Sequence, residues 1–208
     1  MSDGANTWEL QGKPALILIH MQHAITDPEG KVAFLHAKAT QESGIIPKQR
    51  ALLAAFRERG LPVIYVNSVH PLDAAEKMSP YGRFYNAIRS SRVNEPGSKD
   101  TEVLSAVANL PGEPVLGNFM FGVFSGNTGG DLKELLRELS VDTLVLAGVA
   151  TGMAVMTAVI QASDLFYRLI VPSDASIDAN QSIHDVAMNM IIPGMALVTT
   201  TEDVIAHL

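Results

Sequence analysis

Short apolar runs alternate with polar segments along the chain. The strongest runs cover residues 15–20, 62–66, 143–149 and 169–172, and weaker runs cover residues 113–118 and 196–200. Continuous Val, Ile and Leu without polar alternation is typical of strands in a parallel sheet that is covered on both faces. The pattern therefore predicts about six strands in a mostly parallel sheet.

Helical spacing of apolar residues predicts helices between these strands. The helix candidates are residues 45–60, 132–139, 151–167 and 180–191. Thr128 and Asp131, ahead of the second candidate, resemble a capping box. The third candidate is apolar almost all round, which predicts a helix buried against the sheet.

The order of these elements predicts the fold class. Strand and helix alternate five or six times, which is typical of an α/β protein with a doubly wound sheet, right-handed crossovers and helices on both faces. No repeat, low-complexity tract or linker divides the chain. We therefore expect residues 1–208 to form a single domain.

Composition excludes several classes of partner and chemistry. The 208 residues have a net charge of −7 and include no cysteine. An acidic chain without runs of Lys and Arg is a poor binder of nucleic acid. No apolar run approaches the roughly 20 residues that cross a bilayer, and the N-terminus lacks the layout of a signal peptide, so we expect a cytoplasmic protein. The absence of cysteine excludes disulfides, thiolate ligands and a cysteine nucleophile.

The carboxyl ends of the predicted strands are where a ligand is expected in such a sheet. The residues that follow these ends include His20, Gln22, His23, Asn67, Ser68, His70, Asn118, Phe121, Thr151 and Asp174. Because neighbouring parallel strands end at the same edge, we expect these side chains to converge on one site.

Two generic readings of these residues are weak. His20 and His23 invite a metal site, but no acidic residue stands at ligand spacing, so we expect no metal and no cofactor. Asp174 offers a Ser, His and Asp set with His20 and either Ser68 or Ser125. No nucleophile elbow supports that set.

Residues 71–99 form a polar insertion between two predicted strands. The insertion carries Arg83, Arg89 and Arg92. A long insertion after the carboxyl end of a strand is where α/β proteins place a loop that covers the substrate. A surface excursion or a subunit contact is the alternative.

Four segments are similar to one known family over nearly the full chain. They are ALILIHMQ (15–22), VIYVNSVHP (63–71), FSGNTGGDL (124–132) and LVLAGVATGMAVMTAV (144–159). These segments resemble the isochorismatase-like family, also called the cysteine hydrolase superfamily. The resemblance implies a three-layer sheet and a homo-oligomer, a dimer or a tetramer.

The resemblance also implies that the catalytic triad of the family is missing. The family's aspartate falls on His20, its lysine on Asn118 and its nucleophilic cysteine on Ala154. The turn from Gly148 to Thr151 matches a turn that often holds a cis peptide in the family. The backbone N–H groups of Ala150 and Ala154 match its oxyanion hole. The chain is therefore expected to be a divergent member that cannot form a thioester.

The main functional hypothesis is an enzyme that acts on a small carboxylated or cyclic substrate by non-covalent acid/base chemistry. His20 would transfer the proton and Asn118 would orient substrate or water. Imidazole has a reference pKa of about 6.5, so activity is expected to titrate between about pH 5 and 8. Further substrate contacts are expected from Gln22, His70, Phe121, Phe124, Thr151 and Met153, and from the arginines of the insertion if the substrate carries a carboxylate.

Two alternatives stay open. The chain is a catalytically inactive family member with a ligand-binding or assembly role, or it hydrolyses its substrate directly through a hydroxyl group. Ser125 and Thr151 are the candidate nucleophiles for direct hydrolysis. Neither has an evident partner base in the sequence.

Overall fold

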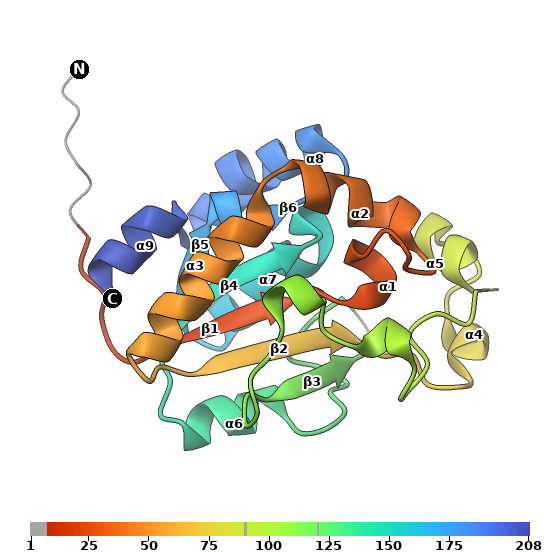
Figure 1. The fold of residues 1–208 in the computed structure, drawn as a ribbon, viewed down its shortest axis with the longest axis horizontal. Helices are drawn as coiled ribbons and strands as arrows, with labels where there is room; N and C mark the ends of the chain where they lie inside the picture. The colour runs from red at the N-terminus through yellow and green to blue at the C-terminus, as the bar shows by residue number, and fades with distance from the viewer. Residues whose placement is uncertain (1–7, 90, 120) are drawn as a thin grey trace.

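A computed structural model describes residues 8–89, 91–119 and 121–208 (Figure 1). Its sheet consists of β1 (Pro14–Ile19), β2 (Val63–Ser68), β3 (Val115–Asn118), β4 (Thr143–Val149), β5 (Arg168–Pro172), β6 (Ser176–Ile177) and β7 (Leu197–Thr199). The strand order is β3-β2-β1-β4-β5-β7, and β6 pairs with β4. All of these pairings are parallel. The predicted α/β class and parallel sheet are confirmed, and the short β6 adds a strand to those expected.

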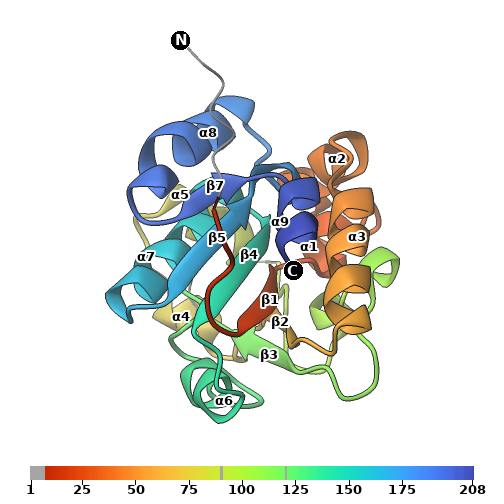
Figure 2. The same ribbon diagram turned by 90° about the vertical axis from the view of Figure 1, so that its left-hand side faces the viewer.

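Helices cover both faces of this sheet. They are α1 (His23–Thr26), α2 (Ala33–Glu42), α3 (Ile45–Glu58), α4 (Ala74–Lys77), α5 (Arg83–Ile88), α6 (Leu132–Glu138), α7 (Met156–Asp164), α8 (Gln181–Val186) and α9 (Thr201–His207). Figure 2 shows α3 and α9 on one side of the sheet and α7 on the other. In the described part of the chain, none of the helices combines the length and apolarity that crossing a membrane requires.

The central strand β1 packs against both helical layers. Leu16 and Leu18 belong to the core cluster that includes α3, whereas Ile17 and Ile19 belong to the cluster that includes α6 and α7. Successive side chains of a strand point to opposite faces, so a run without polar residues is what a doubly covered strand needs. The continuous apolar run of β1 is therefore explained by the burial of both faces of the sheet.

The start of α6 differs from the predicted capping box. Asp131 is itself the N-cap, and its Oδ1 accepts a hydrogen bond of 2.9 Å from the backbone N–H of Glu134. This bond satisfies one of the amides that a helix leaves unpaired at its N-terminus. Thr128 instead forms an isolated antiparallel bridge with Gly117.

The helix predicted to be buried all round is buried on one side only. Ala158, Val159 and Ala162 of α7 are fully buried, whereas Met153 and Ile160 are 38% and 39% exposed. The sheet covers one face of this helix, so the apolar residues on its other face reach the surface. Residues 151–155 form a π-helical turn before α7 begins.

We predict that Gly148→Ala destabilises the protein strongly. Gly148 has φ +137°, and a Cβ there would lie 2.1 Å from the carbonyl oxygen of Ile19. Backbone strain and overpacking together should lower the free energy of unfolding by about 3 kcal/mol or more. Urea denaturation measures the change.

Gly60→Ala is the matched control. Gly60 also has a positive φ, +64°, but its missing Cβ would meet no atom within 4 Å. This variant should lose only about 1 kcal/mol, the conformational cost alone. Equal losses in the two variants would show that the contact between β1 and β4 is not tight.

Candidate active site

A pocket lies at the carboxyl ends of β1, β2 and β4. About 60 Å³ of it is free for the centre of a water-sized molecule, and its space between atoms, open solvent at the mouth included, is about 650 Å³. The expected site residues on its wall are His20, His70, Phe121, Ala150, Met153 and Ala154. The polar residues that follow three neighbouring strands thus converge, as parallel strands ending at one edge require.

An aromatic wall closes the pocket on the side of the insertion. Phe84 and Tyr85 of α5 and Phe119 after β3 line it together with Phe121. The Phe121 ring lies 5.2 Å from that of Phe84 and 5.9 Å from that of Tyr85, measured between centroids. The insertion therefore contributes apolar surface to the pocket.

His20 follows β1 directly and is held by Asn118 at the end of β3. Its Nε2 lies 3.0 Å from Asn118 Oδ1, and Asn118 Nδ2 donates to the carbonyl oxygen of Gly122 at 3.3 Å. An amide oxygen can only accept, so Nε2 of the neutral ring must carry the hydrogen. The other ring nitrogen, Nδ1, then holds a lone pair in a side chain that lines the pocket.

Burial keeps the His20 ring neutral. Desolvation lowers the pKa of His20 to about 4, although the hydrogen bond to Asn118 opposes this shift, and the nearby His70 and His36 lower the pKa further. Burial disfavours the charged imidazolium because no counter-charge replaces the lost hydration. The expected titration between pH 5 and 8 is therefore wrong for this residue.

The turn after β4 brings a free backbone donor to the pocket. The Val149–Ala150 peptide is cis, as the resemblance implied. The carbonyl oxygen of Ala150 accepts hydrogen bonds from the amides of Met153 and Val155 at 3.3 and 3.1 Å. The N–H of Ala150 has no hydrogen-bond partner among the described residues. Ala150 and Ala154 both line the pocket, so this N–H is available to a ligand there.

Ser68 and His70 form a hydroxyl–imidazole pair on the pocket wall. Ser68 Oγ lies 3.0 Å from His70 Nε2, and both residues are buried apart from the surface they present to the pocket. Burial lowers the pKa of His70, and a hydrogen bond with the backbone of Val93 opposes the shift. The sequence suggested Ser68 only as a partner of His20 and Asp174, because spacing alone does not show which imidazole faces a hydroxyl.

Three expected substrate contacts do not line the pocket. Gln22 is fully buried, and its amide bonds the backbone of Ser68 instead of a ligand. The hydroxyl of Thr151, also fully buried, lies 2.9 Å from Nδ1 of His184. The Phe124 ring stacks on Tyr167 with centroids 5.9 Å apart. These side chains are already engaged with the protein, so the expectation that they contact substrate is corrected.

The other residues considered for a Ser, His and Asp set lie apart from the pocket. Asp174 accepts hydrogen bonds from the amide and hydroxyl of Thr201 and pairs with Lys48 at 3.0 Å. Ser125 lies 3.5 Å from the carbonyl oxygen of Gly122. Neither residue contributes to the pocket wall.

The pocket wall carries no ionised side chain in the described part of the chain. Arg83, Arg89 and Arg92 are absent from it. Arg89 donates to two backbone carbonyls at the end of α4, and Arg92 pairs with Glu95. The expected pairing of these arginines with a substrate carboxylate has no support in this geometry.

The decisive comparison is with protein-family models. The model of the isochorismatase domain matches residues 14–203. The chain belongs to the isochorismatase family. Its relatives include an uncharacterized isochorismatase family protein of Bacillus subtilis, YwoC, which is 24% identical over 196 residues and 92% covered in both chains.

Two further comparisons extend this assignment of the isochorismatase-family chain. The ureidoacrylate amidohydrolase RutB of Methylobacterium radiotolerans is 28% identical over 185 residues, which cover 83% of this chain and 70% of the relative. The solved structure of an isochorismatase family protein from Burkholderia thailandensis has a TM-score of 0.79 at 26% identity, covering 96% of this chain and 97% of its own.

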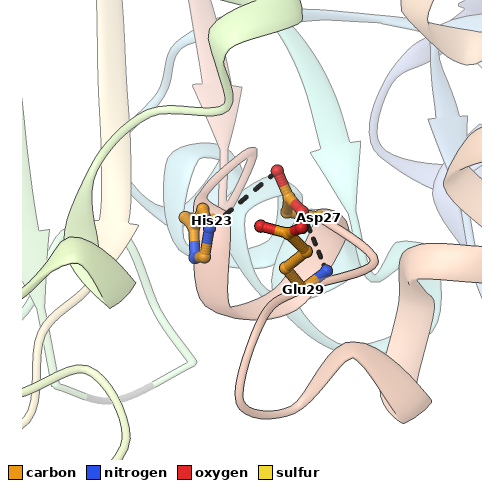
Figure 3. Close-up of side chains that lie close together, drawn as sticks. All are labelled: His23, Asp27 and Glu29. Atoms are coloured by element: carbon orange, nitrogen blue, oxygen red, sulfur yellow. Dashed lines mark hydrogen bonds and ion pairs between the residues drawn. The ribbon is translucent and has the colours of Figure 1, made fainter.

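Figure 3 shows a cluster of groups of the metal-ligating type at the start of α1 and in the turn that follows it in this isochorismatase-family protein. The ligand atoms of His23, Asp27 and Glu29 lie within 4.8 Å of one another, and His23 Nε2 is 4.0 Å from Asp27 Oδ2. The expectation that no acid stands at ligand spacing is therefore wrong, since Asp27 follows His23 by one helical turn. The cluster does not line the pocket, and His20 is not part of it.

We predict that Ala154→Leu closes the pocket of this isochorismatase-family protein. Ala154 is 2% exposed and lines the pocket, so a larger side chain must fill it. Small amides and esters that raise the Tm of the wild type should no longer raise that of the variant, while overpacking costs about 1 to 3 kcal/mol.

Ala162→Leu is the matched control for this experiment. Ala162 is fully buried on the same helical segment but does not line the pocket. It should lose comparable stability and still bind the same compounds. Unchanged binding by a folded Ala154→Leu protein would place the ligand elsewhere.

Proposed function

We propose that this chain is a hydrolase-like enzyme that acts on a small, uncharged, cyclic substrate by non-covalent acid/base chemistry, with neutral His20 as the base. The observation that carries the proposal is the geometry of His20. Its Nε2 is bonded to Asn118, its Nδ1 holds the lone pair of the neutral ring, and the residue lines the pocket. The neutral, aromatic wall favours an uncharged substrate over the carboxylated one, because a buried carboxylate needs a counter-charge.

In the proposed hydrolysis, His20 and the backbone N–H groups of the pocket each have one role. His20 Nδ1 takes a proton from a water molecule, whose oxygen attacks the substrate carbonyl. The substrate oxygen accepts from the N–H of Ala150, joined by that of Ala154, which matches the family's second oxyanion donor by resemblance. The protonated His20 then returns the proton to the leaving group, while its Nε2–H stays bonded to Asn118. Ala154 stands where the family has its cysteine, so no covalent thioester forms.

The name of one relative supports a proposal for the type of bond that this chain hydrolyses. RutB is named as an amidohydrolase. An amide or a related acyl bond is therefore the first substrate class to examine for this chain.

A ligand-binding protein without catalysis is the second candidate. The observation in its favour is that uncharged Asn118 replaces the family's lysine, so no charge supports His20. The open pocket fits both candidates, because side chains have not filled it. Turnover by the wild-type protein separates them.

We predict that His20→Ala abolishes turnover and that the wild-type rate is flat across neutral pH. Loss of a general base costs about 10² to 10⁴-fold in kcat. A base with a pKa of about 4 is neutral throughout pH 5 to 8, so the rate should fall only as the pH approaches 4 and His20 gains a proton.

His23→Ala is the matched control, since this histidine lies outside the pocket and should be dispensable for turnover. A steady-state pH profile of kcat/KM checks both statements. Full activity in folded His20→Ala, or a rate that titrates near pH 6.5, would remove neutral His20 from the mechanism.

We predict that Ala154→Cys alone gives at most trace amidase activity. A thiol has a reference pKa of about 8.5 and is mostly protonated at pH 7, and uncharged Asn118 supplies no charge to stabilise the thiolate. Useful hydrolysis should require His20→Asp and Asn118→Lys as well. Assays of the single and triple variants on simple amides decide this, and robust turnover by the single variant would contradict it.

A further inference from the structure

We propose that Ser68 is a second reactive group of the pocket, a nucleophilic serine that His70 activates and that accepts acyl groups from small uncharged esters. Ser68 is the last residue of β2, and His70 follows it by two positions. Ser68 Oγ lies 3.0 Å from His70 Nε2, which is the separation of a nucleophile and its base. Both side chains line the pocket, so an ester bound there can reach the hydroxyl.

The tautomer of His70 suits a general base. The backbone of Val93 raises the pKa of His70, which is the direction expected for a carbonyl that accepts from the ring. Burial acts in the opposite direction and is the larger cause, so the ring is neutral at neutral pH. In the tautomer that carries its hydrogen on Nδ1, the neutral ring offers the lone pair of Nε2 to the hydroxyl of Ser68.

Gln22 fixes the backbone that carries the serine. Ser68 N–H donates to Gln22 Oε1 at 2.6 Å, and Gln22 Nε2 donates to the Ser68 carbonyl at 3.1 Å. The same Nε2 contacts Asn94 Oδ1 at 2.9 Å, and the amide of His70 donates to the Asn94 carbonyl at 2.7 Å. One buried amide therefore positions both members of the pair, as a preorganised site requires.

Two other hydroxyl groups of the described chain, those of Thr151 and Ser125, meet only part of these conditions. Thr151 bonds His184 in a similar pair, but Thr151 is absent from the pocket wall. Ser125 has no imidazole partner and is also outside the pocket. Ser68 combines an imidazole partner with access to a ligand.

The reaction conserves atoms and charge with water as the only co-reactant. Ser68 Oγ bonds to the ester carbonyl carbon while its proton passes to His70 Nε2. The bond from that carbon to the leaving oxygen breaks, and His70 gives the proton to the departing alcohol. Water then attacks the acyl-serine while His70 takes its proton. The bond from the acyl carbon to Ser68 Oγ breaks and His70 returns the proton to Oγ, which releases the carboxylic acid and restores both residues. Aromatic acyl groups suit the wall formed by Phe84, Phe119 and Phe121.

Covalent labelling of the full chain tests the proposal. Phenylmethanesulfonyl fluoride, an uncharged aromatic reagent, should form one adduct, which peptide mass spectrometry places on Ser68. Ser68→Ala and His70→Ala should each slow labelling about 100-fold or more, the contribution of a nucleophile and its base. Ser125→Ala, which changes a serine outside the pocket, should label at the wild-type rate.

The absence of native cysteine allows a second test that does not depend on serine reagents. In Ser68→Cys, iodoacetamide can alkylate only the new thiol, and its rate should titrate below the reference thiol pKa of about 8.5. Adding His70→Ala should return the midpoint toward that reference.

Both labelling experiments work without catalytic turnover, so their results do not depend on the role proposed for His20. Adducts on a residue other than Ser68, undiminished labelling of a folded Ser68→Ala protein, or a Ser68→Cys profile that His70→Ala leaves unchanged would each overturn the assignment. Labelling of Ser68 in a protein that shows no hydrolysis through His20 would support this proposal and contradict the other.

Discussion

The two central strands, β1 and β4, approach more closely at Gly148 than a side chain would allow. A Cβ at this position would lie 2.1 Å from the Ile19 carbonyl oxygen. Each strand ends within two residues of this contact, so His20 and the turn at Ala150 enter the same space. The pocket lies beside this approach, because His20 and Ala150 directly follow the two strand ends and both line it.

Burial without counter-charge then determines the electrostatics of the pocket. Desolvation is the largest cause of the lowered pKa of His20, His36 and His70, which all line it. Neutral imidazoles can accept protons and hydrogen bonds but cannot attract an anion. The chemistry that suits such a pocket is proton abstraction from a neutral group, which the two proposals assign to His20, acting on water, and to His70, acting on the Ser68 hydroxyl.

Two polar residues next to the pocket, Gln22 and Thr151, hold other parts of the protein in place. Their residue types alone do not show this role. Gln22 and Thr151 were expected to contact substrate because they follow strand ends. Both are fully buried, and their polar atoms are bonded to other parts of the protein. A buried amide or hydroxyl must find partners, and these partners come from segments that are distant in the sequence.

The sequence by itself determined the parallel sheet and the helices α3 and α6, because continuous apolar runs and helical stripes record burial directly. It also indicated the edge of the sheet where the pocket lies, because parallel strands end at one edge. It did not predict α2, which contributes only Ala37 and Thr40 to the buried set, so its apolar pattern is faint. Only the tertiary structure decided that Ser68 faces His70, that His20 is neutral and that Gln22 lies behind the wall. Side-chain partners and desolvation depend on segments folded together from across the chain, and spacing along one segment carries no record of them.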